Sequence, residues 1–517
     1  MSAIPESLFE KPTQPPENLQ RLFRYPVSHH NKAEIFQYLT DTHQSYNKCQ
    51  LEINKYNALI LLLESKKEKL KKSMEKFRSL LSPVHRLPSE LLLEIFGYLC
   101  EVNVLDHSKM PPASALSMVC GRWRQVTLAS PRLWSSISLQ LDRSEGRRDK
   151  VIANLAQLFL ERSKNTALKL RIDFSWHTEW SHDGLSHLTV LRLLEEQSER
   201  WEELEVYGRE LYASSRSQGD LHLPNLKHLA FYTRALDSPQ TSWALDRFKN
   251  CPALTSFYSD VADIEDRIEL PWGNIRVLKL EDCLMTAALI VLGSCTSLEH
   301  LGIRNVGQSS WPEEVMVVSD TIRTLSISGK DCMPTIVSHF TFRHLSSVTI
   351  DDTDISSLDL EQFIKRSSCS ITTLRLDGLW LTDSQLLSLL RLMPDLRTLE
   401  VGECRSGRVI TSRFLDRLAA DLDNPHNPFL PHLTELRLKI SAKELEERAL
   451  VNALTSRWLP GDSPFASTAM GVDRIESVDV VLLWWNGPPI QDMLSSLQCL
   501  RDIGLRLTIS HVTRMRD

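Results

Sequence analysis

The chain has 517 residues, more than one ordinary hydrophobic core accommodates, so we expect about two to four structural units. Its hydrophobic content of 42% and charged content of 24% are typical of a soluble globular protein. The formal net charge of −6 gives no general reason to expect binding to nucleic acid or to an anionic membrane. No run reaches the roughly 18 apolar residues that a membrane-spanning helix needs.

Ten cysteines are scattered singly, without a Cys-x-x-Cys pair or a histidine pair at metal-ligand spacing. They predict free thiols in a reducing compartment, and with no signal-peptide layout in the first residues they favour the cytoplasm or the nucleus. No Gly-x-Ser-x-Gly, phosphate-binding glycine-rich loop or His-Glu-x-x-His occurs. We therefore expect no catalytic residues, no metal and no cofactor.

The first 33 residues are rich in Pro, Gln, Asn and Glu, and we expect residues 1–33 to be mobile. From Ile35 to Leu81, apolar residues recur at alternate steps of four and three, with Thr42 and Lys67 as polar exceptions. This spacing predicts one continuous coiled-coil helix over residues 34–82 and a homodimer formed through residues 35–81. The alternative is a helix that folds back on its own chain or acts as a spacer. Its basic run, from Lys66 to Arg78, is interpreted as a solvated face rather than a nucleic-acid contact.

Residues 83–136 contain two apolar helical segments. The first begins at Leu87-Pro88, with Glu90 in its first turn, where a fixed φ and a negative charge both suit a helix N-terminus. Two apolar stripes are predicted along it, one of Leu92, Phe96 and Leu99 and the other of Leu91 and Ile95. Because some fifty residues cannot easily bury two stripes by themselves, one face is expected to dock on the rest of the chain or on a partner.

This arrangement resembles the F-box. The residues that carry the resemblance are Leu87, Pro88, Leu91, Ile95, Phe96 and Leu99 in the first half, and Val119, Cys120, Trp123, Leu133 and Trp134 in the second. In that family the module binds the adaptor subunit of an SCF-type cullin–RING ubiquitin ligase. The resemblance implies that these residues bind the adaptor and, through it, the cullin, while the rest of the chain holds a target protein. The alternative is that these helices only cap the following domain.

Two features depart from the family pattern. Residues 101–112 form a longer polar insert, which resembles the F-box variant common in mushroom-forming fungi and which we predict to be a surface loop. Gly121 stands where a basic residue is usual.

Beyond residue 137 the apolar signature L-x-x-L-x-L recurs. The central residues of nine successive copies, 21 to 28 residues apart, are Leu204, Leu229, Phe257, Leu278, Leu301, Leu325, Val348, Leu374 and Leu399. Degenerate copies centred on Leu436, Val478 and Ile503 follow, with an insertion predicted at residues 459–471. A period of about 20–29 residues is typical of leucine-rich repeats. Since one such unit cannot bury its own apolar face, residues 137–517 are predicted to stack into an irregular leucine-rich-repeat solenoid, or horseshoe. A leucine-rich α/β domain without solenoid order is the alternative.

In such a horseshoe, residues between and just after the strand leucines face the concave surface. The acidic residues at these places, which we predict to bind a basic segment of the target, are Glu281, Asp282, Asp351, Asp352, Asp377 and Glu403. The alternative is a solvated polar face without a partner. Trp311, Trp380, Trp484 and Trp485 are candidate anchors or core residues.

The sequence therefore predicts an α/β protein with a long N-terminal coiled-coil helix, a small helical F-box and a repeat domain. Its predicted function is that of a non-catalytic substrate-recognition subunit of a ubiquitin ligase. The competing interpretation is a scaffold protein with a vestigial F-box.

Overall fold

The computed structural model describes residues 15–24, 27–106, 109–141, 147–173, 188–208, 221–232, 248–260, 269–305, 316–329, 337, 339–352, 356–378, 380–403, 408–419, 428–441, 447–458, 472–483, 495–502 and 504–512. The chain divides into two compact units, Met1–Leu91 and Leu92–Asp517. The boundary between the units falls inside helix α3 (Ser89–Leu99).

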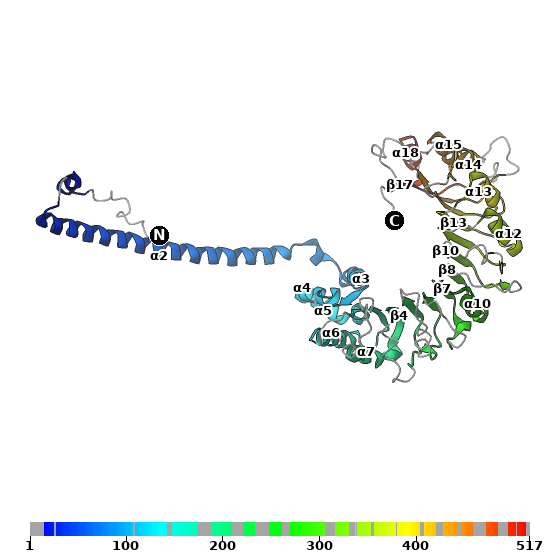
Figure 1. Cartoon of the computed structure of the whole chain (residues 1–517), viewed down its shortest axis with the longest axis horizontal. Coiled ribbons are helices and arrows are strands. Elements are labelled where there is room, and N and C mark those ends of the chain that lie inside the picture. The colour runs from blue at the N-terminus through cyan, green and yellow to red at the C-terminus, as the bar shows by residue number, and fades with distance from the viewer. Residues whose placement is uncertain are drawn as a thin grey trace. The chain divides into compact units, whose positions relative to one another are not determined.

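Unit 1 consists mainly of helix α2 (His29–Ser79), which is 51 residues long (Figure 1). Neither glycine nor proline interrupts it, and the hydroxyl of Ser28 caps its start by accepting a hydrogen bond from the N–H of Asn31 (3.4 Å). The predicted long helix is confirmed. None of the helices in the described part of the chain is both long and apolar enough to cross a membrane.

Helix α1 (Glu17–Arg21) and the 3-10 turn η2 (Leu22–Arg24) precede α2. The amide of Asn18 on α1 donates a hydrogen bond to the carboxylate of Glu34 on α2 (3.4 Å). Part of the segment predicted to be mobile is therefore helical, and residues 1–14, 25 and 26 lie outside the described residues. The 3-10 turn η3 (Pro83–Arg86) leads from α2 toward α3.

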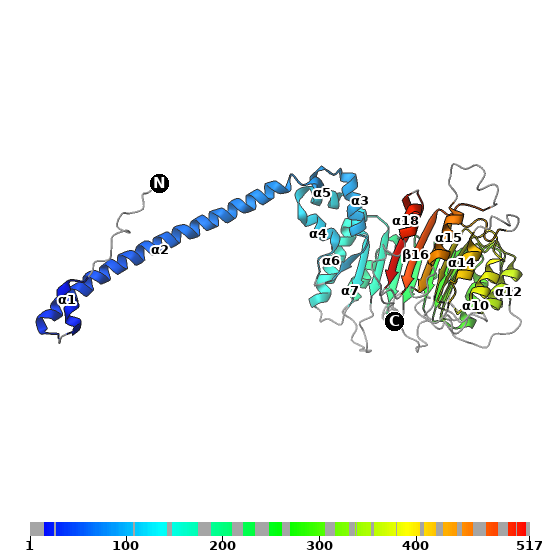
Figure 2. The same cartoon turned by 90° about the horizontal axis from the view of Figure 1, so that it is seen from above.

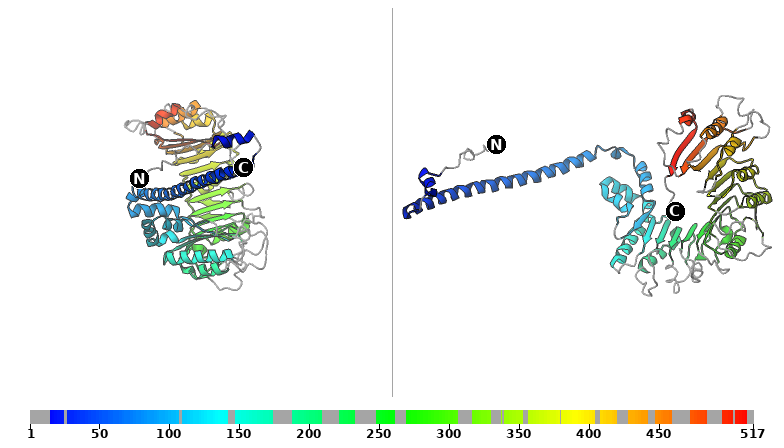
Figure 3. Two further views of the ribbon diagram at one scale, coloured as in Figure 1. Left: turned by 90° about the vertical axis from the view of Figure 1, so that its left-hand side faces the viewer. Right: turned by 45° about the horizontal axis from the view of Figure 1, so that its top comes forward.

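In the described residues, unit 2 is built on a sheet of 15 strands that follow in chain order, with every neighbouring pair parallel (Figures 1 and 3). Its strands are β1 (Asn103–Leu105), β2 (Ser136–Gln140), β3 (Leu168–Asp173), β4 (Trp201–Tyr207), β5 (His228–Tyr232), β6 (Ser256–Ser259), β7 (Val277–Glu281), β8 (His300–Arg304), β10 (Thr324–Ser328), β12 (Ser347–Asp351), β13 (Thr373–Asp377), β14 (Thr398–Gly402), β15 (Glu435–Ser441), β16 (Ser477–Leu483) and β17 (Arg506–Val512). Strands β9 (Val317–Ser319) and β11 (Phe340–Phe342) form a separate parallel pair.

Among the described residues of unit 2, helices lie along one face of the large sheet and leave its other face open (Figures 1 and 2). The helices and 3-10 turns of unit 2 after α3 are α4 (Pro112–Val119), α5 (Gly121–Ala129), η4 (Pro131–Trp134), α6 (Arg147–Ser163), α7 (Leu188–Glu195), η5 (Ser198–Arg200), η8 (Trp272–Asn274), α10 (Met285–Ser294), α12 (Ser357–Ser367), α13 (Asp383–Leu390), α14 (Ser412–Leu418), α15 (Glu447–Arg457) and α18 (Ser495–Asp502). The predicted α/β class is confirmed.

The central residues of the repeated apolar signature stand opposite one another in neighbouring strands. Leu204 pairs with Leu229, which pairs with Phe257, and this ladder continues through Leu278, Leu301, Leu325, Val348, Leu374, Leu399, Leu436 and Val478. All of these side chains are buried. Because side chains alternate along a strand, the residues between them face the open side of the sheet.

The last predicted copy, centred on Ile503, is misplaced. Leu500 lies in α18, and it is Leu507 on β17 that pairs with Val478. The apolar spacing from Leu500 to Leu505 matches the signature by chance, because Leu500 lies in a helix and Leu505 precedes the strand. The strand is β17, which pairs with β16. Residues 459–471, where an insertion was predicted, lie outside the described residues.

Candidate functional site

Helix α3 has one buried face and one exposed face. Leu92 and Phe96 are 1% and 0% exposed, whereas Leu91, Ile95 and Leu99 are 50%, 46% and 54% exposed. Leu99 was predicted to lie with Leu92 and Phe96, but it belongs with Leu91 and Ile95, because it follows Ile95 by one helical turn. We call Leu91, Ile95 and Leu99 the α3 stripe.

Before α3, Leu87 is partly exposed and Pro88 is exposed. In the second half of the motif, Val119 at the end of α4 is 60% exposed and its neighbour Met118 is 66% exposed. Cys120 is half-buried, and its sulfur accepts a hydrogen bond from the N–H of Trp123 (3.5 Å) at the start of α5. The thiol therefore occupies a helix-capping position between α4 and α5.

Three residues predicted to bind the adaptor lie in the interior of the chain instead: Phe96, Leu133 and Trp134. The rings of Phe96 and Trp123 have centroids 4.8 Å apart with planes inclined at 60°. The indole N–H of Trp134 donates a hydrogen bond to the carbonyl of Thr127 (2.9 Å). Large apolar rings are stabilised by burial, so these residues hold the helices together.

The insert at residues 101–112 is not a simple surface loop, because it supplies β1, which pairs with β2. Asn103 is fully buried at the place where the other strands carry an apolar residue, since it pairs with Ile137. Its amide donates hydrogen bonds to the carbonyls of Cys100 (3.2 Å), Leu133 (3.0 Å) and Ser136 (3.0 Å), and its side-chain oxygen accepts from the N–H of Ala113 (3.0 Å). One side chain thus fixes both halves of the motif to the edge of the sheet.

Trp134 also joins the motif to the first helix after it. Its ring meets that of Phe159 on α6 with centroids 4.9 Å apart, and the guanidinium of Arg162 lies 4.4 Å from the centroid of its ring. Burial, with the charge of nearby Arg124, lowers the pKa of Arg162. The predicted boundary after residue 136 is therefore a packed junction.

Among the acidic residues predicted to bind the target, Glu403 is buried. It accepts hydrogen bonds from the backbone N–H groups of Val409 (3.2 Å), Ile410 (2.9 Å) and Ser441 (2.8 Å). A carboxylate that holds three backbone donors in the interior has a structural role, and Glu403 does not lie on the exposed surface where it was predicted.

Asp351 and Asp377 lie on the open face, next to a lysine. The ammonium of Lys439 pairs with Asp377 and with Glu400 (2.9 Å). Burial and the neighbouring charge of Asp377 raise the pKa of Asp351, and Lys439 opposes that change. In this part of the open face, the positive charge of Lys439 thus partly neutralises the nearby carboxylates.

The remaining acidic residues lie near the ends of β7 and β12. Glu281 accepts a hydrogen bond from the hydroxyl of Tyr258 and forms an ion pair with Arg304 (3.1 Å). Asp282 and Asp352 follow the strands with φ of 51° and 46°, the left-handed conformation that short polar side chains tolerate. These two aspartates shape the turns that leave the sheet.

Sequence reasoning missed a stack of tyrosines on the same face. The rings of Tyr207 on β4 and Tyr232 on β5 have centroids 4.2 Å apart and planes within 5°, and Tyr258 on β6 follows at 4.4 Å. The guanidinium of Arg171 covers the outer side of Tyr207 at 4.4 Å. All three tyrosines are half-buried, and burial raises their pKa values. The sequence signal that could have predicted this stack is a tyrosine directly after a buried residue in three successive copies of the apolar signature. We call Tyr207, Tyr232 and Tyr258 the tyrosine ladder.

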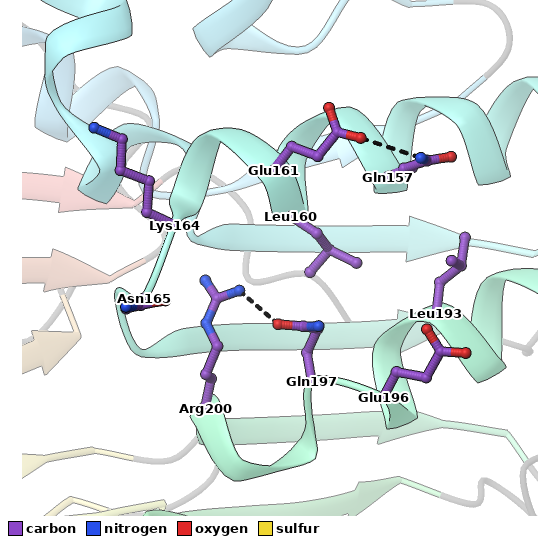
Figure 4. A pocket seen from close by; sticks show the side chains of 9 residues that line it. All are labelled: Gln157, Leu160, Glu161, Lys164, Asn165, Leu193, Glu196, Gln197 and Arg200. Carbon is purple, nitrogen blue, oxygen red and sulfur yellow. Dashed lines mark hydrogen bonds between the residues drawn. The ribbon is translucent and has the colours of Figure 1, made fainter.

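A hollow of about 360 Å³ lies between α6 and the segment that follows α7 (Figure 4). Arg200 in its wall donates hydrogen bonds to Gln197 (2.9 Å), to the hydroxyl of Ser163 (2.7 Å) and to the carbonyl of Thr166 (2.9 Å). The guanidinium thereby ties η5 to the end of α6.

Of the candidate tryptophan anchors, Trp380 is 64% exposed, and Trp311, Trp484 and Trp485 lie outside the described residues. Among the residues with described positions, no three His, Cys, Asp or Glu side chains meet as metal ligands would.

No curated protein matches this chain. Residues 84–140 match a family model described as F-box-like, and the match spans α3 to β2, with the buried Phe96, Asn103 and Trp134 and the exposed α3 stripe. This part of the chain is an F-box-like domain.

Proposed function

We propose that this chain is the substrate-recognition subunit of an SCF-type cullin–RING ubiquitin ligase and binds the adaptor through its F-box-like domain. F-box domains generally bind such an adaptor. The observation that carries the proposal is the α3 stripe, which is apolar and exposed within a domain of that family. Covering it with a partner contributes roughly 25 cal/mol per Å² of apolar area removed from water. Pro88 and Val119 are exposed as well, and we include them in the proposed contact.

The test is capture of the purified adaptor by the full chain. We expect Ile95→Glu to abolish capture while the thermal unfolding midpoint stays near that of the wild type, because Ile95 is already half exposed. Glu94→Gln, an exposed change one residue away on α3, is the matched control and should bind normally. Leu87→Ala with Pro88→Ala examines the start of the motif. A wild-type chain that fails to bind the adaptor contradicts the proposal and favours a scaffold with a vestigial F-box.

We further propose that residues 137–517 form a leucine-rich-repeat arc whose open face holds the target protein. The parallel strands in chain order, the ladder of buried central residues and the helices on a single face support it. The tyrosine ladder offers aromatic area there, and aromatic residues dominate binding hot spots. A basic segment of the target would compete with Lys439 for Asp351 and Asp377.

The mechanism that we propose needs no catalytic side chain in this chain. By holding a target lysine near the ubiquitin-charged enzyme, the receptor raises their effective concentration. The described cysteines are free thiols, which supports a reducing compartment, the cytoplasm or the nucleus.

We also propose that two copies associate through residues 35–81, which gives the ligase two receptor arms. The support is that apolar seam residues of α2 are exposed along the whole helix. Those more than half exposed are Leu39, Tyr46, Ile53, Ile60, Leu63, Leu70, Met74 and Phe77, and Leu81, just after the helix, is more than half exposed as well. Sedimentation of the full chain at tens of micromolar measures this, and a monomer would remove the proposal.

A further inference from the structure

The apolar seam of α2 faces water along nearly its entire length. Helices in proteins gain most of their stability from packing of an apolar face. An apolar seam that stays in water therefore contributes little to the stability of this helix of 51 residues. The seam has the heptad spacing of a coiled coil from one end to the other. A second α2 matches that spacing and that length, so a second copy of this chain is the occupant that fits.

The two halves of α2 differ in charge. Residues 29–58 hold three basic and three acidic residues, a net charge of zero. Residues 59–79 hold seven basic and three acidic residues, a net charge of +4. This asymmetry makes the orientation of the two helices matter.

A parallel, in-register pair would place the two +4 halves side by side. It would set Lys67 against Lys67 of the partner subunit inside the seam, and Lys66 beside Lys71 of the partner subunit at its edge. Like charges at such close positions are destabilising. An antiparallel pair instead lays each basic half along the neutral half of the other copy.

In the antiparallel register that overlaps the full seam, Ile53 lies opposite Leu63 of the partner subunit. The residues that precede every second core position, beginning with Leu39, then meet along one edge. This brings Glu52 beside Lys66 of the partner subunit, twice per dimer. Within its own chain, Glu52 forms a loose ion pair with Lys55 (3.7 Å). Among the described residues its Oε2 atom has no hydrogen-bond partner.

We propose that two copies pair through α2 in the antiparallel orientation, with Glu52 facing Lys66 of the partner subunit. This deepens, and rests on, the proposed self-association through residues 35–81. The charge distribution along α2 selects this orientation, and it places the two F-box-like domains at opposite ends of the paired helices.

Cys49 reports the orientation directly, because it is an exposed free thiol at a core position of the seam. In the antiparallel register, Cys49 lies opposite Lys67 of the partner subunit. The two Cys49 residues are then 18 residues apart along the axis, about 27 Å at 1.5 Å per residue. A disulfide needs Cα atoms within about 7 Å, so they cannot be linked to each other.

The first experiment is therefore mild oxidation of the full chain carrying Lys67→Cys, with linked peptides identified by mass spectrometry. We expect a link between positions 49 and 67 that joins two chains, and no Cys49–Cys49 link in the wild type. The same two positions within one helix are equally far apart, so the link cannot form inside a chain. Cys49→Ala combined with Lys67→Cys is the control and should lose the link. A Cys49–Cys49 link in a dimer overturns the orientation and leaves self-association standing, whereas a monomer overturns both.

The second experiment reverses the charge of one residue. The resulting change in affinity has opposite signs in the two orientations. In the antiparallel dimer, Lys66→Glu turns two attractive contacts with Glu52 into repulsive ones and should raise the dissociation constant about tenfold. In a parallel dimer the same change would pair residue 66 with Lys71 and tighten association. Adding Glu52→Lys should restore the wild-type constant within about threefold. Tightening by Lys66→Glu alone, or no rescue by the double change, would overturn the proposal.

Discussion

The amide of Asn103 and the carbonyl of Leu133, 30 residues apart in sequence, are joined by a hydrogen bond of 3.0 Å in the interior of the F-box-like domain. Asn103→Leu keeps a similar volume but removes all four hydrogen bonds of that side chain, so three carbonyls and the N–H of Ala113 lose a buried partner. We expect the free energy of unfolding to fall by about 3 kcal/mol. Denaturant unfolding of the purified full chain measures the change.

Asn225→Leu is the matched control for that substitution. Asn225 is an exposed asparagine that donates one hydrogen bond to the carbonyl of Glu199 (2.8 Å), and its loss should cost less than about 1 kcal/mol. Equal losses for the two variants would mean that Asn103 has no special role in fixing the domain to the sheet.

Phe96 and Ile95 are neighbours on α3, and we expect substitution of Phe96 to lower the stability of the fold and substitution of Ile95 to weaken adaptor binding. Phe96→Ala removes a fully buried ring that packs on Trp123 and should lower the free energy of unfolding by about 3–5 kcal/mol. Ile95→Ala, on the exposed face, should cost less than about 1 kcal/mol and yet weaken adaptor capture. Calorimetry and adaptor capture on the same two proteins give both quantities, and a comparable loss of stability in both would contradict the two-faced helix.

The sequence was sufficient where periodicity is strong. The central residues from Leu204 to Val478 were recognised because apolar residues recur at near-regular spacing, and the register of the strands confirms each of them. The long helix followed from heptad spacing without a glycine or proline. In both cases a local pattern decides the structure, so no long-range information was needed.

Three of the misses have a common physical cause, which is long-range contact. The polarity of Asn103 predicts a loop, but its side chain is buried and bonded to the carbonyls of Leu133 and Ser136, 30 and 33 residues away. Glu403 resembles a surface acid until the N–H groups of Ile410 and Ser441 are placed beside it. The tyrosine ladder exists only when three strands lie side by side, although each tyrosine is visible in the sequence.

Glu403 provides a test of this distinction between surface and interior. Glu403→Ala leaves the N–H groups of Val409, Ile410 and Ser441 without their acceptor, and we expect the free energy of unfolding to fall by about 3 kcal/mol or more. Glu476→Ala is the control, because Glu476 is exposed and has an ion pair with Arg506 (3.3 Å) that contributes less than about 1 kcal/mol. Loss of target binding by Glu403→Ala without loss of stability would mean that Glu403 contacts the target and has no structural role.

Asp351 gives a prediction for pH. Its pKa is raised above the ordinary value of 3.8, first by burial and then by the charge of Asp377, so the folded state holds this proton more tightly than the unfolded state does. The ionised carboxylate therefore costs stability at neutral pH, and this cost disappears as pH falls through the raised pKa toward the ordinary value. Asp351→Asn removes the charge, and we expect it to raise the free energy of unfolding at pH 7 by on the order of 0.5 kcal/mol. Denaturant unfolding of both proteins between pH 7 and pH 4 should show the two curves converging as pH falls, and a wild type that is more stable than Asp351→Asn at pH 7 would show that Lys439 outweighs burial at this site.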